Sequence, residues 1–77
     1  MINNDILHSI CDIFDFNDSK IINIFSLTDM NLSKHELSAL FRKPGHKHYR
    51  FCKDQVLEEF LKGMQLKYRP EIHLKTL

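Results

Sequence analysis

Glycine and proline are scarce in this sequence, which has two of each among its 77 residues. Gly45 and Gly63 are isolated from one another. This excludes the glycine-rich loops with which P-loop and dinucleotide-binding proteins hold phosphates. No stretch of about 18 apolar residues occurs, so no membrane-spanning helix is predicted.

Cysteine is also rare. Cys11 and Cys52 are far apart in the sequence and form no CxxC pair, so we expect two free thiols. The first residues, MINNDIL, lack the basic region and apolar core of a secretory signal. We therefore expect a cytoplasmic protein.

What is present suits one folded domain of residues 1–77. The chain is 43% hydrophobic and 27% charged, a composition typical of globular proteins rather than disordered ones. Its net charge of +1 is unevenly distributed: residues 1–33 carry −4 and residues 34–77 carry +5. Such an asymmetry can steer a partner, or attract a second copy head to tail.

Apolar residues recur with helical spacing through most of the chain. The pattern predicts helices at roughly residues 4–15, 18–28, 34–42 and 53–68. No strand pattern is present. The predicted fold is therefore all-α, a compact bundle of four short helices with a basic irregular loop before the last one.

Several residues indicate where these helices start. Asn3 or Asn4 is expected to cap the first helix, and Asn17 or Asp18 the second. The stretch Ser33-Lys34-His35-Glu36 is a capping box, in which serine and glutamate side chains each bond the other residue's amide.

Glycine and proline indicate where the last two helices end or pack. Pro44-Gly45 predicts a turn after the third helix, and Pro70 is expected to close the fourth. Gly63 lies inside the fourth helix, where it costs about 1 kcal/mol relative to alanine. It indicates either a close approach of another helix or a neutral choice.

Residues 42–53, RKPGHKHYRFCK, form the most unusual stretch, which we call the basic segment; it holds five of the eleven Lys and Arg residues. Its cations can contact phosphates and its aromatic residues can stack on unpaired bases. Alternatively it is a solvated loop with Tyr49 and Phe51 packed inward. The candidate contact residues for nucleic acid or another partner are Arg42, Lys43, Lys47, Tyr49, Arg50, Lys53 and Lys67.

A metal site and a catalytic site are not expected. His35, His46, His48 and Cys52 are ligand types that zinc accepts, but the paired spacing of structural zinc sites is absent. No GxSxG motif or comparable arrangement of serine, histidine and aspartate predicts a hydrolase. We therefore expect no enzyme and no cofactor. Cys52, close to Lys53 and a helix start, is the better candidate for a reactive thiol.

The stretches NNDIL and LSKHELSALFRKPGHKHYRFCKDQVLEEFLKGMQLKYRP resemble the repeat unit of the YehS-like bacterial family, a domain of unknown function. The resemblance is strongest over Leu32–Pro44 and His46–Pro70, where it is closest to the second of the two repeats usual in that family. It implies an all-helical fold and a cytoplasmic bacterial or phage-like source, and it supplies no activity. Only one repeat is present here, so a homodimer or a second repeat is the expected partner.

These observations favour a small helical interaction module that self-associates or acts as an adaptor. The alternative is a nucleic-acid-binding domain that uses the basic segment and the last helix, although a pI near 7.8 is low for such a protein. Some apolar residues are left over from the predicted helix faces and are candidates for a contact surface. They are Ile13, Phe16, Ile24, Leu66, Ile72 and Leu74.

Overall fold

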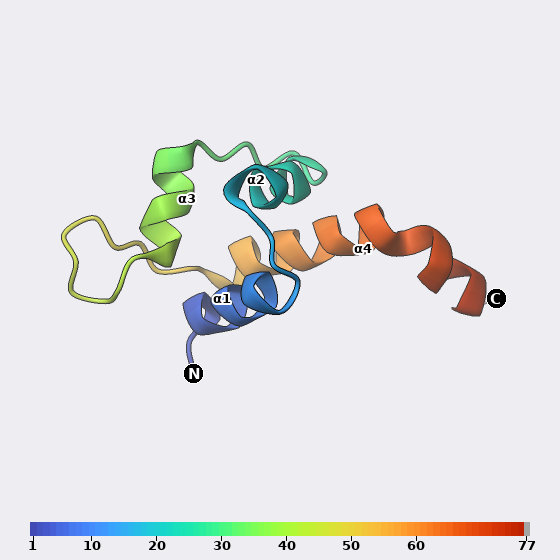
Figure 1. The fold of residues 1–77 in the computed structure, drawn as a ribbon, viewed down its shortest axis with the longest axis horizontal. Coiled ribbons are helices and arrows are strands. Elements are labelled where there is room, and N and C mark those ends of the chain that lie inside the picture. The colour runs from blue at the N-terminus through green and yellow to red at the C-terminus, as the bar shows by residue number, and fades with distance from the viewer. Residues whose placement is uncertain (77) are drawn as a thin grey trace.

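The computed structural model describes the backbone of residues 1–76 and the side chains of residues 1–68. It contains α1 (Asn3–Ile13), α2 (Asp18–Ser26), α3 (Lys34–Phe41) and α4 (Asp54–Thr76), and no strand within those residues. This confirms the all-α prediction. α1 and α2 pack on the first half of α4, α3 packs on α1 and α2, and the basic segment loops out beyond α3 (Figure 1).

The helix ends differ slightly from those predicted. α1 stops at Ile13 rather than near residue 15. α4 continues to Thr76, so the end predicted near residue 68 is too early. Proline lacks a backbone N–H and crowds the carbonyl four residues before it, which weakens a helix at Pro70 without forbidding its continuation. The side chains of Ile72 and Leu74 lie outside the described residues.

Two of the three predicted N-terminal helix caps are confirmed. The Asn17 side chain accepts a hydrogen bond from the Lys20 amide at 2.8 Å. The Ser33 hydroxyl accepts from the Glu36 amide at 3.1 Å, and the Glu36 carboxylate accepts from the Ser33 amide at 3.0 Å. These bonds satisfy amides that the first turn of each helix leaves without a partner.

The predicted cap of α1 is wrong. Asn3 and Asn4 lie inside the first turn, and it is Asp5 whose carboxylate accepts from the Ile2 amide, at 3.2 Å. Because the helix begins one residue earlier than predicted, both asparagine side chains are released from capping. They bond to distant parts of the chain instead.

α1 and α2 both end in a left-handed residue that is aspartate rather than glycine. Asp15 has φ 54° and Asp29 has φ 63°. Next to them, the Phe16 amide donates to the Cys11 carbonyl and the Met30 amide to the Phe25 carbonyl, at 3.0 and 3.1 Å. This is the Schellman arrangement, in which a bond reaching five residues back closes the helix end.

The core lies between the four helices. The buried residues Leu7, Cys11, Ile21, Ile24, Phe25, Leu37, Leu40, Cys52 and Phe60 form one cluster. At its centre the rings of Phe25 and Phe60 pack with centroids 5.1 Å apart, joining α2 to α4. Ile24 and Phe16, two of the residues left over from the predicted helix faces, contribute to this core or pack against it.

Gly63 marks the place where α2 crosses α4 most closely. A Cβ added there would collide with the Ile24 carbonyl oxygen and lie 2.9 Å from the Ile24 Cγ2 atom. Of the two explanations that the sequence left open, the structure shows the close approach. No helix in the described part of the chain is both long enough and apolar enough to cross a membrane.

Candidate interaction surfaces

The basic segment is held in place by one buried asparagine, Asn4, which is only 4% exposed. Its side-chain amide donates to the carbonyls of Leu40 and Arg50, at 3.0 and 2.9 Å. Its oxygen accepts from the Tyr49 hydroxyl at 3.2 Å and the Cys52 amide at 2.8 Å. An asparagine side chain offers two donors and one oxygen with two lone pairs, so all of its capacity is used. Asn4 thus joins α1 to the end of α3 and to the return of the basic segment.

Further bonds fix the end of the segment that returns to α4. Asn3 donates to the Cys52 carbonyl at 3.0 Å and to the Asp54 carboxylate at 2.7 Å, where α4 begins. The Arg50 amide donates to the Ala39 carbonyl at 3.0 Å. Near the start of the segment, Gly45 adopts φ 96° and makes the turn that Pro44-Gly45 predicted. The segment is therefore a shaped loop anchored at its base.

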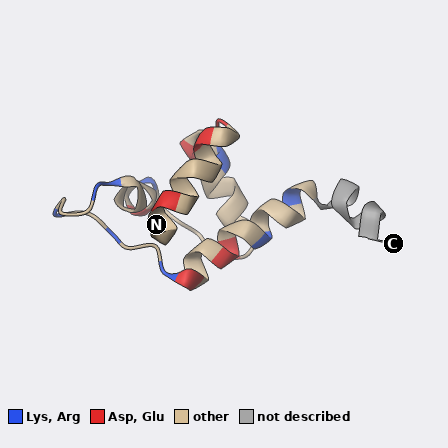
Figure 2. Ribbon diagram, turned by 90° about the horizontal axis from the view of Figure 1, so that it is seen from below, with Lys and Arg blue, Asp and Glu red and all other residues tan. Residues whose placement is uncertain are grey.

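The structure brings together only part of the predicted contact set. Arg42, Lys43, Lys47 and Lys53 are exposed along the basic segment. Figure 2 shows the basic segment as a loop that projects from the end of α3 and returns to the start of α4, with Lys and Arg positions spaced along it.

The other cations and Tyr49 have different surroundings. Arg50 lies 3.9 Å from the Glu36 carboxylate across a cleft, and Tyr49 is partly buried through its bond to Asn4. Lys67 lies 3.4 Å from the Asn23 side-chain oxygen of α2. It is fourteen residues beyond Lys53 on α4, or about 20 Å along the helix axis, so it does not belong to the same surface.

Phe51 is exposed, and the prediction that it packs inward is wrong. Its side chain is 49% exposed, whereas Cys52 beside it is fully buried. Successive residues of extended chain face opposite sides. Because the Cys52 amide is bonded to Asn4 and its side chain enters the core, Phe51 must face the solvent.

Three histidines lie close together, His46 and His48 in the basic segment and His35 on α3. The ring of His48 lies 5.6 Å from that of His46 and 5.9 Å from that of His35, measured between centroids. His46 accepts a hydrogen bond from the His48 amide on Nδ1, at 3.0 Å. No group of three His, Cys, Asp or Glu side chains within residues 1–68 has an arrangement that holds a metal ion.

The two thiols are buried, which contradicts the interpretation of Cys52 as a reactive residue. Burial raises the pKa of Cys52, and the nearby Asp54 carboxylate raises it further. Burial and the neighbouring Asp12 raise the pKa of Cys11 to about 11. A thiol reacts as its thiolate, so both are unreactive while the fold is closed. Sequence proximity to Lys53 did not reveal that the Cys52 side chain enters the core.

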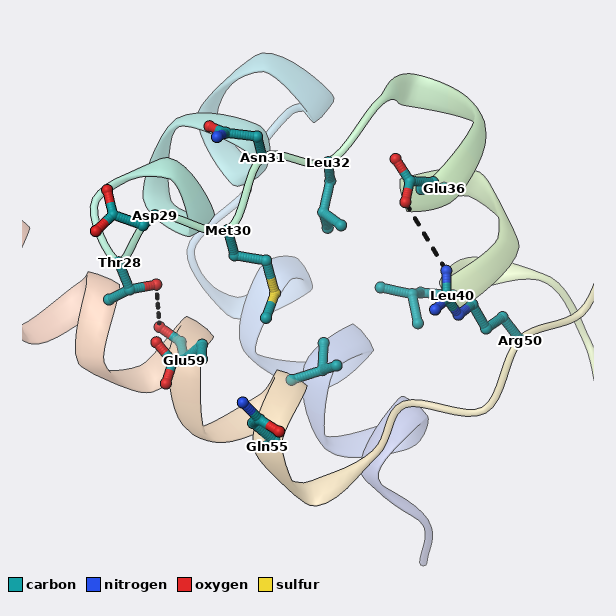
Figure 3. Close-up of a pocket in the computed structure, with 11 residues that line it drawn as sticks. Thr28, Asp29, Met30, Asn31, Leu32, Glu36, Leu40, Arg50, Gln55 and Glu59 are labelled. Carbon is teal, nitrogen blue, oxygen red and sulfur yellow. Dashed lines mark hydrogen bonds and ion pairs between the residues drawn. The ribbon is translucent and has the colours of Figure 1, made fainter.

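A cleft lies on the other side of the returning basic segment. It has a volume of about 510 Å³ and opens between the α2–α3 connection, α3, Arg50 and the first turns of α4 (Figure 3). No sequence pattern indicates this cleft, because its walls come from residues as far apart as Thr28 and Glu59.

An apolar stripe runs along one side of α4. Leu57, Leu61, Met64 and Tyr68 follow the spacing i, i+4, i+7 and i+11, which puts them on one side of a helix. Leu57 and Met64 pack against the core, while Leu61 and Tyr68 remain 41% and 39% exposed. The α4 stripe thus extends from the core to the surface.

Comparison with known proteins identifies the family to which these features belong. Residues 3–69 match the family described as "Protein of unknown function (DUF1456)". The chain is also 34% identical over 62 residues to the "Uncharacterized protein YehS" of Escherichia coli (strain K12). That match covers 80% of this chain and 40% of the relative, so the chain spans less than half of the relative's length. No solved structure matches.

Proposed function

The chain belongs to the DUF1456 family of unknown function, and from that premise we propose that it is a non-catalytic interaction module that pairs with a second copy of its fold. The second copy is either another chain or a second repeat. Because the chain spans 40% of its relative in Escherichia coli, a protein of that length has room for two such domains. We also place the protein in the cytoplasm, where buried free thiols such as Cys11 and Cys52 persist.

The observation that carries this proposal is the α4 stripe. None of its four residues is charged, and two of them expose about two fifths of their side-chain surface. α1 packs on α4 and ends in Ile13 and Phe14, which are 76% and 54% exposed. Apolar and aromatic side chains of this kind form the centres of homodimer interfaces. A two-fold pair would place the same stripe on both sides of the contact.

The experiment is sedimentation velocity over a wide range of protein concentrations. The proposal predicts a mass approaching two chains as concentration rises. The variant Leu61→Glu should remain at the mass of one chain, because a carboxylate in the contact would lose its hydration. Leu66→Glu is the matched control, since Leu66 is equally exposed on the same helix but lies about 140° away around its axis.

A one-chain mass for the unmodified protein at the highest concentration would overturn self-association between chains. Equal loss of dimer in Leu61→Glu and Leu66→Glu would assign the contact to a different face. Circular dichroism of each variant separates loss of contact from loss of fold.

A second candidate function is binding of single-stranded nucleic acid, and the exposure of Phe51 favours it. An exposed aromatic ring close to Lys53, on a loop with four further exposed cations, provides both a stacking surface and phosphate contacts. The test is fluorescence anisotropy of labelled RNA and DNA oligonucleotides at increasing salt. Binding should weaken steeply with salt and fall in Phe51→Ala. An absence of binding at low salt would remove this candidate.

A further inference from the structure

The cleft beside Arg50 has the size and lining of a binding site. Its volume of about 510 Å³ falls within the range of roughly 300–1,000 Å³ that is usual for ligand sites. Met30 and Leu32 from the α2–α3 connection, Leu40 from α3 and Val56 from α4 supply its apolar lining. In Figure 3 the side chains of Met30, Leu32 and Leu40 point toward its centre.

The walls of the cleft are tied together across the sequence. The Thr28 hydroxyl lies 3.3 Å from the Glu59 carbonyl, which links the α2–α3 connection to α4. On the opposite wall, Arg50 reaches Glu36 at 3.9 Å. That ion pair is long and its two side chains are 61% and 43% exposed. It can therefore open at little cost, whereas the apolar lining belongs to fixed elements.

The charge around the opening is mostly negative. Three carboxylates, Asp29, Glu36 and Glu59, line the cleft against the single guanidinium of Arg50. Glu36 remains ionised because hydrogen bonds from Ser33 lower its pKa. Lys62 lies 3.7 Å from Glu59 on the outer side of α4 and does not line the cleft. An occupant with positive charge fits this opening, and an anionic one such as nucleic acid is opposed.

We propose that the cleft binds a peptide segment of a partner protein that inserts one bulky apolar side chain between flanking Lys or Arg residues. The apolar side chain would contact Met30, Leu40 and Val56. The flanking cations would pair with Glu59 and Asp29, and with Glu36 where Arg50 swings aside. This surface is separate from the α4 stripe, so pairing of two copies and peptide binding can each fail independently.

The experiment titrates the isotopically labelled 77-residue chain with three short peptides and follows its backbone amides by NMR. The probe is acetyl-Lys-Phe-Lys-amide, with a Kd on the order of 1 mM expected from one buried aromatic ring and weak ion pairs. Acetyl-Lys-Ala-Lys-amide lacks the apolar group, and acetyl-Glu-Phe-Glu-amide reverses the charge. The shifts should concentrate in residues 28–32 and 55–59, and both altered peptides should bind at least threefold more weakly.

A matched pair of variants separates the cleft from general charge. Glu59→Gln should weaken the Lys-Phe-Lys peptide about threefold, whereas Glu58→Gln should leave its affinity unchanged. The Lys62 ammonium lies 3.5 Å from the Glu58 carboxylate and 3.7 Å from the Glu59 carboxylate, but only Glu59 lines the cleft.

Two results would overturn the proposal. One is equal affinity for the three peptides, or shifts confined to residues outside the cleft. The other is a set of cleft shifts that appears on raising the protein concentration alone, which would make a second copy the occupant.

Discussion

Replacing Gly63 by alanine should destabilise the fold, although alanine is the better helix former. The added Cβ would collide with the Ile24 carbonyl oxygen and lie within 2.9 Å of its Cγ2 atom. The first of these atoms belongs to the backbone of α2 and cannot rotate away. α2 would have to move from α4 to an ordinary contact distance of about 3.5–4 Å.

The magnitude follows from two opposing effects. Alanine gains about 1 kcal/mol in helix propensity over glycine. Overpacking a tight interface costs about 1–3 kcal/mol, and occasionally more when the backbone must move. The displaced surface includes the contact between Phe25 and Phe60, whose ring centroids are 5.1 Å apart. Because the clashing atom belongs to the backbone, we take the upper end of that cost, about 3 kcal/mol. Subtracting the gain in propensity leaves a net loss of about 2 kcal/mol, which lowers Tm by roughly 8–16 °C in a domain of this size.

Urea unfolding followed by circular dichroism measures this loss. The control is Gln65, an exposed residue two positions further along α4. There the order should reverse, with Gln65→Ala more stable than Gln65→Gly by about 1 kcal/mol. If Gly63→Ala is more stable than the unmodified protein, propensity outweighs packing and the close approach of α2 and α4 is refuted.

Four further predictions concern helix ends and titrating groups. Asp15→Gly and Asp29→Gly should each stabilise by about 0.5 kcal/mol, because glycine adopts positive φ freely and removes an acid from a helix C-terminus; an unchanged urea midpoint would contradict this. Ser33→Ala should destabilise by about 1 kcal/mol through loss of the α3 cap. The Ser33 amide and hydroxyl lower the pKa of Glu36 below 4.5. The contribution of ionised Glu36 to the free energy of unfolding is therefore present above that pH, and it is lost as the pH falls through the pKa of Glu36 in the folded protein. Thermal unfolding of Glu36→Gln should therefore show a smaller loss of stability in acid than that of the unmodified protein. Burial raises the pKa of Cys11 from 9.0 to about 11. The contribution of the protonated thiol to the free energy of unfolding is therefore fully present below pH 9, and it should fall by about 2 kcal/mol by pH 11. Equal alkaline loss in Cys11→Ala would refute that assignment.

The features that the sequence predicted well depend on neighbours in the chain. The α3 capping box joins Ser33 and Glu36, which are three residues apart, and Asn17 caps an amide three residues away. Apolar spacing likewise located the four helices, because one buried side of a helix repeats every three or four residues. Gly63 was correctly singled out, although only the structure could show that α2 is what approaches it.

The features that the sequence missed depend on long-range contacts. Asn4 was interpreted as a cap because asparagine near a helix start usually is one. Its four partners lie 36 to 48 residues further along the chain. Those same bonds turn Cys52 inward and Phe51 outward, which reversed the predicted roles of both. Lys67 was included with the basic segment for its charge, and the length of α4 separates them.

Asn4 also explains why the basic segment has a definite shape in so small a domain. A loop of twelve residues, most of them charged, histidine or aromatic, has few apolar contacts of its own. The fully bonded Asn4 side chain fixes the returning end of the segment against α1 and α3. An unbonded side-chain amide at that buried position would be costly. Any partner of the basic segment would therefore meet a preformed surface.

The most direct test of this account is the rate at which iodoacetamide labels the two buried cysteines, followed by peptide mass spectrometry. In Asn4→Ala, Cys52 should be labelled at least tenfold faster than in the unmodified protein, while Cys11 changes much less, because the basic segment opens locally. Asn17→Ala, which removes the cap of α2 and costs about 1 kcal/mol, is the control and should speed both cysteines equally. If Asn4→Ala also speeds Cys11 and Cys52 by the same factor, Asn4 stabilises the whole domain and does not specifically anchor the basic segment.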